Sequence, residues 1–216
     1  MANLFETRRD FLRNACVTVL SLPILIGCKN NTIAQTESDI LKRLKLKALP
    51  TGGEWSGAID APADVSWKTA LAAADDPGER MVISGTVFLA DGKTPAPNTL
   101  IYFYHTDVHG IYGRAGQHRH GKYRGWMLTD ERGRYEFSSI RPASYPNSTQ
   151  SQHVHMTLTT LDQKEDWIDS ILFEGDRFLT SRERETAGSK GGFFPIVKLA
   201  KGANGVMAAT RDIKLG

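Results

Sequence analysis

The chain of 216 residues contains two cysteines, Cys16 and Cys28, and both lie in its first 28 residues. The rest of the chain therefore carries neither a disulfide nor a cysteine-based zinc site. We also find no Ser-His-Asp grouping, no glycine-rich phosphate loop and no internal repeat. The formal net charge of +3 is too small and too scattered to indicate nucleic-acid binding. With 40% hydrophobic and 24% charged residues, the composition is that of a globular protein and excludes a disordered chain.

The sequence shows no hydrophobic run of transmembrane length. The apolar stretch 15–27 is 13 residues long and is interrupted by Pro23, whereas a spanning helix needs about 20 residues. We interpret this stretch as the apolar region of a signal peptide. The alternative is a buried N-terminal helix.

The residues around this stretch support the signal peptide. The pair Arg8-Arg9 is followed by Asp10, Phe11 and Leu12, which resembles a twin-arginine export signal. The segment 25–28, Leu-Ile-Gly-Cys, resembles a lipobox, in which the cysteine is lipidated after cleavage. We therefore predict export by the twin-arginine route to the periplasm or cell envelope, with membrane contact only through a lipid on Cys28. Cleavage without lipidation and no cleavage are the alternatives.

The chain divides into three predicted parts. Residues 1–28 form the signal peptide with its lipobox, 29–75 a tether and covering segment, and 76–216 a β-sandwich domain. Within the covering segment, we expect a short helix at 39–49 and helical turns at 67–74.

The domain has the pattern of an all-β protein. Apolar and polar residues alternate in short β-branched segments separated by turn residues, which is typical of an antiparallel sandwich or barrel. We predict an antiparallel β-sandwich of about seven or eight short strands with irregular loops and few helices. The turn Asp130-Glu131-Arg132-Gly133 predicts a hairpin. The expected strands are 81–89, 100–104, 126–129, 134–137, 153–160, 168–173, 194–199 and 206–213.

Histidine and tyrosine are concentrated in one part of the chain. All six histidines lie within 105–155 and all six tyrosines within 102–145. His153 and His155 are two residues apart on a predicted strand, so both side chains project from one face. A lone pair of this kind also occurs by chance, but Tyr112 and Tyr145 lie in nearby loop segments. Phenolate is a hard anionic donor that suits a trivalent cation such as Fe(III).

These residues occur within a longer resemblance. Residues from about 74 to 180 resemble the intradiol ring-cleavage dioxygenases, which open catechols between their two hydroxyls. The matching segments follow the order found in that family. They are Asp76-Pro77-Gly78-Glu79, Ile83-Ser84-Gly85-Thr86-Val87, Asp107-Val108-His109-Gly110-Ile111-Tyr112, 124–137, Ile140-Arg141-Pro142, Tyr145-Pro146, His153-Val154-His155 and Leu172-Phe173-Glu174-Gly175-Asp176.

The resemblance implies a site and a reaction. Tyr112, Tyr145, His153 and His155 would bind Fe(III). A small aromatic diol would bind as a dianion, the freed Tyr145 phenolate would accept a proton, and dioxygen would open the ring to a muconate-type diacid. This reaction belongs to the breakdown of aromatic compounds. The sequence carries no signal for an oligomeric state.

One position departs from the family pattern. The family usually has an arginine three residues before the first ligand histidine, whereas this chain has Gln150. We assign Gln150 a catalytic position, although a neutral amide stabilises developing negative charge less well than a cation does. The alternative function is therefore a non-catalytic, surface-anchored β-sandwich binding module with a degenerate metal site.

Three other groups have alternative interpretations. The basic segment 118–120, His-Arg-His, is either a solvated surface loop or a cover over the pocket that pairs with an acidic substrate group. His105 and His109 flank Asp107 and are candidates for contacts that support the metal ligands. The charged segment 182–185 is interpreted as a solvated face.

Overall fold

The computed structural model describes residues 39–49, 57–113, 118–202 and 204–216. The predicted signal peptide, with Arg8, Arg9 and Cys28, lies outside these residues. The chain divides into two units, Met1–Glu37 and Ser38–Gly216, and everything described below belongs to the second. No helix among the described residues is both long and apolar enough to span a bilayer.

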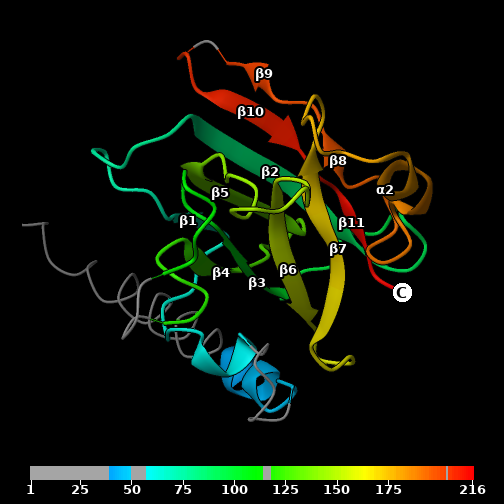
Figure 1. Ribbon diagram of the computed structural model, residues 1–216. Helices are drawn as coiled ribbons and strands as arrows, with labels where there is room; N and C mark the ends of the chain where they lie inside the picture. Colours follow the sequence, from blue (N-terminus) through cyan, green and yellow to red (C-terminus); the bar gives the residue numbers. More distant parts are fainter. Residues whose placement is uncertain (1–38, 50–56, 114–117, 203) are drawn as a thin grey trace, which may run out of the picture. The chain divides into compact units, whose positions relative to one another are not determined.

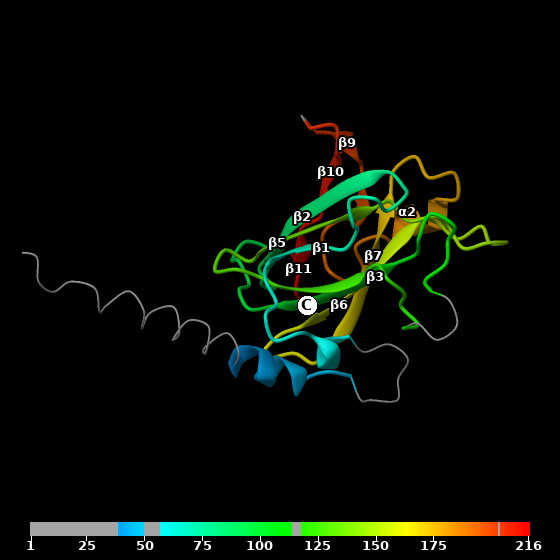
Figure 2. The same ribbon diagram turned by 90° about the vertical axis from the view of Figure 1, so that its left-hand side faces the viewer.

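The second unit contains two β-sheets, as the sequence predicts (Figures 1 and 2). The first sheet has the order β1 (Lys68–Ala70), β5 (Arg134–Ile140), β2 (Arg80–Phe88), β10 (Met207–Thr210) and β9 (Ala200–Lys201), and β11 (Ile213–Lys214) also pairs with β2. The second has the order β4 (Arg124–Leu128), β3 (Leu100–His105), β6 (His153–Thr159), β7 (Asp166–Phe173) and β8 (Ile196–Val197).

The all-β sandwich is confirmed, with two refinements. The long strands pair antiparallel, but the short strands β1, β8, β10 and β11 join their neighbours in parallel, so both sheets are mixed. The described residues contain eleven strands rather than seven or eight, because several pairings involve only two or three residues.

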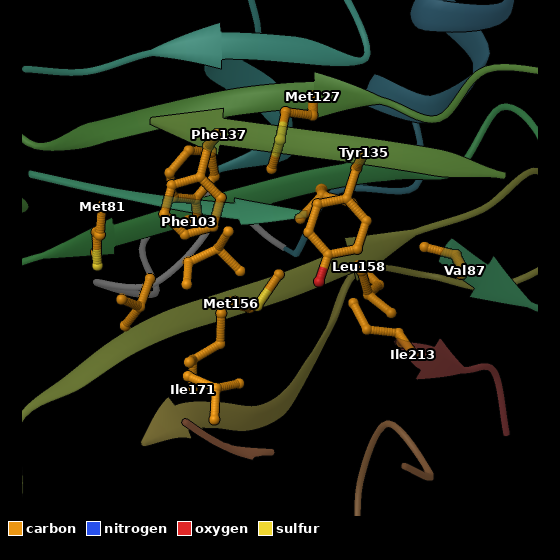
Figure 3. Close-up of a cluster of buried hydrophobic side chains, with 14 of the residues drawn as sticks. Met81, Val87, Phe103, Met127, Tyr135, Phe137, Met156, Leu158, Ile171 and Ile213 are labelled. Carbon is orange, nitrogen blue, oxygen red and sulfur yellow. The ribbon is translucent and has the colours of Figure 1, made fainter. Parts of the chain in front are cut away.

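The core lies between the two sheets (Figure 3). Alternate residues of each strand point inward, so Phe103 from β3 packs on Phe137 from β5 with ring centroids 4.3 Å apart. Met81 from β2 and Met156 from β6 are fully buried in the same cluster. Because the inward residues of β6 fill the core, the alternate residues His153 and His155 face the other side of the sheet.

The predicted hairpin at Asp130 is wrong, although the turn itself forms. The Asp130 carbonyl accepts a hydrogen bond from the Gly133 amide at 2.8 Å. The flanking strands, however, belong to different sheets, because β4 pairs with β3 and β5 pairs with β2. The Thr129 amide already donates to Thr99, while the Gly133 carbonyl accepts from Val87 in β2. The turn therefore carries the chain from one sheet to the other.

The prediction for residues 67–74 is also wrong. The structure has β1 there, paired in parallel with β5, and the Trp67 carbonyl accepts from the Glu136 amide at 2.9 Å. Sheet-edge hydrogen bonding has overridden the weak local helical preference. Residues 39–45 are helical, in agreement with the helix expected at 39–49.

The N-terminal described residues cover part of the second sheet's outer face. Leu41 and Leu44 form a small buried cluster with Leu100 and Leu128 from that sheet. The 3-10 helix η1 (Ala58–Asp60) joins this cluster. The buried Glu165 carboxylate accepts hydrogen bonds from the Gly57 amide at 3.0 Å and the Thr157 hydroxyl at 2.7 Å. The loops described next lie at the other end of this outer face.

Candidate metal centre

Strand β6 places His153 and His155 side by side. Both side chains leave the outer face of the second sheet, and their Nε2 atoms are 3.0 Å apart. This is the geometry expected from a two-residue spacing on a strand. The ladder between β6 and β7 is irregular between Val154 and Met156, next to His155.

The two predicted tyrosines converge on the same point from separate loops. The Tyr145 hydroxyl lies 3.0 Å from Nε2 of His153 and 3.3 Å from Nε2 of His155. The Tyr112 hydroxyl forms a short hydrogen bond with the Tyr145 hydroxyl. The structure therefore brings together all four side chains that the family resemblance selects as ligands.

Close backbone packing holds the two tyrosine loops against each other. The Asp107 carboxylate accepts from the amides of His109 at 2.8 Å and Ile111 at 3.0 Å, which fixes the turn before Tyr112. Gly110 in this turn has φ +76°, and a Cβ there would lie 2.0 Å from the Ser144 carbonyl oxygen. Only glycine permits this approach, so Gly110 sets the spacing between the two loops.

Both histidine rings are neutral, and His153 presents an unprotonated nitrogen to the site. Nδ1 of His153 lies 2.6 Å from the Ser151 carbonyl, which can only accept a hydrogen bond, so Nδ1 carries the proton and Nε2 a lone pair. Nδ1 of His155 lies 3.3 Å from the Ser170 hydroxyl. Burial lowers the pKa of His153, and it lowers the pKa of His155 to about 3. Both rings are therefore neutral near pH 7, as metal ligands must be.

Burial weakens both phenols as acids. Burial raises the pKa of Tyr112, and its hydrogen bond to Tyr145 raises that pKa further. Burial also raises the pKa of Tyr145, but the same hydrogen bond lowers it in part. Either hydroxyl can be the donor of their shared hydrogen bond.

The donor set fits a metal ion. Two bonds of about 2.1 Å meeting at a right angle place their donor atoms about 3.0 Å apart, which matches the separations between Tyr145, His153 and His155. The described residues contain no group of three or more His, Cys, Asp or Glu suited to a metal, so the phenols are needed to complete this set. Phenolate oxygens favour a hard trivalent ion.

A cavity of about 350 Å³ opens beside these donors. Gln150 borders it, which is where the sequence analysis places this residue. Arg119 and His120 border it too; His120 is buried, whereas His118 and Arg119 are exposed. The lining residues are Tyr104, Tyr112, Arg119, His120, Tyr145, Gln150 and His155.

Two residues near the site were assigned other roles from the sequence. Glu183 in α2 (Ser181–Thr186) was interpreted as solvated, but its carboxylate accepts from Ser151 at 2.8 and 2.9 Å. The Thr180-x-x-Glu183 capping box is a sequence signal that could have revealed its fixed position. His105 bonds to Thr106 and Ser139 rather than to any of the four donors.

Comparison with known proteins identifies the family. Residues 57–190, more than half of the chain, match the family Dioxygenase_C, described as "Dioxygenase". The chain belongs to this family, and its resemblance to the intradiol dioxygenases is confirmed at that level.

Two relatives illustrate the range of similarity. The catechol 1,2-dioxygenase of Acinetobacter baylyi is 33% identical over 88 residues, which are 39% of this chain and 28% of the relative. The protocatechuate 3,4-dioxygenase beta chain of Burkholderia cepacia is 30% identical over 150 residues, which are 64% of this chain and 62% of the relative. The match thus spans less than two thirds of either relative.

Solved structures share the fold. The dioxygenase domain of a dioxygenase carbohydrate-binding protein fusion from Streptomyces sp. SirexAA-E gives a TM-score of 0.55 at 20% identity, covering 78% of this chain and 96% of that domain. A catechol 1,2-dioxygenase from Acinetobacter sp. ADP1 also gives 0.55, at 21% identity, covering 70% of this chain and 57% of that chain. These likenesses establish the architecture.

Proposed function

We propose that this protein is an Fe(III)-dependent intradiol dioxygenase that cleaves a catechol-type ring with dioxygen to a muconate-type diacid. The observation that carries this proposal is the convergence of two neutral imidazoles and two phenols at one edge of a cavity. The names of the relatives, which include catechol and protocatechuate dioxygenases, support the same reaction class.

The protein's own residues bind, orient and deprotonate the diol. Iron, when bound, makes the catecholate reactive toward dioxygen. His153 and His155 are the neutral donors, held by Ser151 and Ser170 through their Nδ1 atoms. Tyr145 borders the cavity and its hydroxyl contacts Nε2 of both histidines, so its oxygen is placed to take a proton from a diol hydroxyl.

The test is the metal content and the visible spectrum of the full chain after expression with ample iron. We expect about one iron per chain and a visible phenolate-to-iron band that shifts when catechol is added without oxygen. Oxygen uptake with catechols then measures ring cleavage. A colourless protein without iron would favour the non-catalytic binding module, and an iron protein that consumes no oxygen with any catechol would indicate a degenerate site.

We also propose that Arg8 and Arg9 direct export by the twin-arginine route and that Cys28 carries a lipid anchor. The paired arginines, the short apolar run and the Leu-Ile-Gly-Cys ending support this proposal. Replacing both arginines with lysine should leave the protein in the cytoplasm, as measured by cell fractionation.

A further inference from the structure

The carbonyl that holds the ring of His153 belongs to a peptide group that also bonds to a carboxylate. The Ser151 carbonyl oxygen lies 2.6 Å from Nδ1 of His153. At the other end of the same peptide group, the Gln152 amide donates to Oδ2 of Asp176, just after β7, at 2.6 Å. A carboxylate, one peptide group and the imidazole of a proposed ligand therefore form one chain of hydrogen bonds.

A peptide group transmits the effect of a charge from one end to the other. Its resonance moves electron density from the nitrogen to the carbonyl oxygen. An anion that accepts the N–H favours this charge separation, because hydrogen bonds in a chain polarise one another. The negative charge of Asp176 therefore makes the Ser151 carbonyl a stronger acceptor for the Nδ1 proton of His153.

The chain of hydrogen bonds is held in place and lies away from water. Ser151 and His153 are both buried. The Ser151 hydroxyl donates to the Glu183 carboxylate at 2.8 Å, and Oδ1 of Asp176 accepts from the Phe178 amide at 3.2 Å. The low dielectric of such a setting strengthens each hydrogen bond in the chain.

His155 is supported in a different way. Its Nδ1 lies 3.3 Å from the hydroxyl of Ser170, which is a neutral group that can rotate. The Nε2 atoms of His153 and His155 are nevertheless only 3.0 Å apart. Two imidazoles thus face one site with unequal support behind them.

We propose that Asp176 is a positioning residue that acts through the 151–152 peptide to make His153 the stronger of the two imidazole donors, an inference that rests on the proposed iron site. A carboxylate behind a ligating imidazole fixes its tautomer and raises its basicity as a ligand. With a peptide group between the two, the ring of His153 keeps its Nδ1 proton and gains electron density at Nε2.

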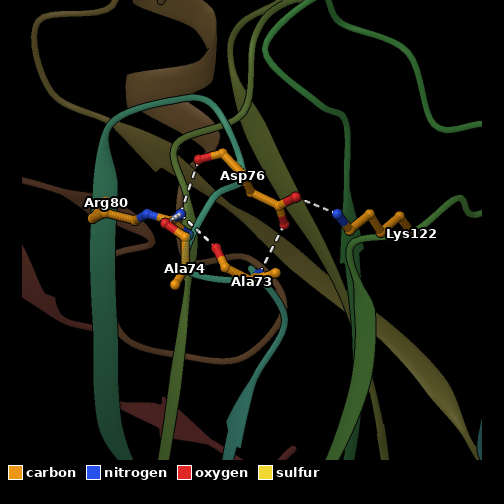
Figure 4. A network of polar contacts seen from close by, with 5 residues as sticks. All are labelled: Ala73, Ala74, Asp76, Arg80 and Lys122. Carbon is orange, nitrogen blue, oxygen red and sulfur yellow. Dashed lines mark hydrogen bonds and ion pairs between the residues drawn. The ribbon is translucent and has the colours of Figure 1, made fainter.

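Asp76 offers a matched control. Its Oδ2 accepts from the Ala73 amide at 2.9 Å, and its carboxylate also pairs with Lys122 (Figure 4). Arg80 holds the same loop through the carbonyls of residues 73, 74 and 76. Asp76 therefore resembles Asp176 in stabilising a loop by accepting a backbone amide, but the network in Figure 4 includes neither the 151–152 peptide nor any of the four proposed ligands.

The experiment replaces Asp176 with asparagine, which has the same shape and can still accept from the Gln152 amide but carries no charge. The first readout is the proton NMR resonance of Nδ1–H of His153 in the iron-free full chain, assigned by its loss in His153→Gln. We expect Asp176→Asn to move this resonance upfield, because a weaker acceptor leaves the proton more shielded. Asp76→Asn should leave it in place.

The second readout uses the iron-loaded full chain. Asp176→Asn should bind iron on the order of tenfold to a hundredfold more weakly, the range found when a partner behind a metal ligand is lost. Its phenolate-to-iron band should shift to longer wavelength, because a poorer imidazole donor leaves the iron a better acceptor of charge. Asp76→Asn should keep the native band and iron affinity, and Asp176→Glu, which restores the charge, should recover part of both.

Each unexpected result has its own meaning. An unmoved Nδ1–H resonance in Asp176→Asn would overturn the proposal, and so would weaker iron binding with a native band and resonance, since Asp176 would then serve only the fold. Equal shifts in Asp76→Asn would overturn it too, because loss of any loop-holding carboxylate would then suffice. If the native chain binds no iron, the proposed function fails, while the Nδ1–H resonance still decides whether Asp176 acts on His153.

Discussion

At the scale of single residues, the proposed reaction gives the two site tyrosines different roles despite their short shared hydrogen bond. Tyr145 contacts both histidine nitrogens, so in the proposed reaction it is the oxygen placed to take the substrate proton. We expect Tyr145→Phe to lower turnover on the order of a hundredfold, because general-base catalysis contributes about that much or more. Oxygen uptake with catechols measures this.

The control for Tyr145→Phe is Tyr123→Phe. Tyr123 is also a buried phenol, but it stacks on His105 and does not border the cavity beside the four donors. Its loss should leave turnover close to the native rate. Native turnover in Tyr145→Phe would show that another group accepts the proton.

A substitution at Gln150 is expected to raise the reaction rate rather than lower it. Because it borders the cavity and is neutral, a cation at this position should stabilise negative charge that develops on the substrate ring. Gln150→Arg is expected to raise the rate by on the order of tenfold, or about 1.4 kcal/mol of barrier. Gln163→Arg, which adds the same charge on an exposed loop, is the control. An unchanged or lower rate in Gln150→Arg would mean that the native site does not lack a cation there.

The sequence predicted the positions of some site residues better than those of others. The strand period alone predicts that His153 and His155 share a face, and the structure shows this. The convergence of Tyr112 and Tyr145 depends on loop packing at Gly110, which no local pattern encodes, and only the family resemblance pointed to it. His120 reads as part of a basic surface loop, because its burial arises from stacking on a strand 16 positions earlier, at Tyr104.

At the scale of elements, α2 is coupled to β6 through one carboxylate. Glu183 completes the capping box with Thr180 and also accepts the Ser151 hydroxyl, while the Ser151 carbonyl fixes Nδ1 of His153. We expect Glu183→Gln to destabilise the fold by about 1 kcal/mol, because two charge-assisted contacts weaken together. Urea unfolding measures this, with the exposed Glu185→Gln on the same helix as the control.

The effect of Glu183 should depend on pH. Burial raises the pKa of this carboxyl, but hydrogen bonds from Thr180 and Ser151 outweigh burial and hold the pKa below its ordinary value of 4.5. A lowered folded pKa means that the ionised form stabilises the fold above pH 4.5 and that this contribution is lost as the pH falls through the folded pKa. The stability difference between native and Glu183→Gln should therefore shrink in acid. A difference that stays constant down to pH 3 would contradict this account.

The local sequence pattern predicts where the long strands lie, but it does not predict which strands pair. The alternation in β2, β3, β6 and β7 predicted these strands nearly at their observed bounds, because their inward residues all meet one core. The partner of a strand is a non-local property, so the turn at Asp130 looked like a hairpin while its two strands entered different sheets. For the same reason, β1 was missed, since its strand geometry comes from pairing with β5.

At the scale of the whole molecule, the sandwich separates stability from chemistry. The core fills the space between the sheets, while the proposed ligands lie on the outer face of the second sheet. That outer face is divided between the N-terminal cover, anchored by Glu165, and the loops that carry Tyr112, Arg119 and Tyr145. We therefore expect loop substitutions to change the proposed site without disturbing the core.

We propose that the chain's first 28 residues determine where the proposed chemistry takes place. If Cys28 carries the lipid, Cys28→Ser should move the exported protein from the membrane fraction to the soluble fraction, because burial of the acyl chains supplies the binding energy. Iron content and visible spectrum should stay native, since the proposed iron ligands all lie within residues 112–155. Cys16→Ser, at the other cysteine of the same segment, should remain in the membrane fraction. If Cys28→Ser stays with the membrane as well, the anchor is the uncleaved apolar segment rather than a lipid.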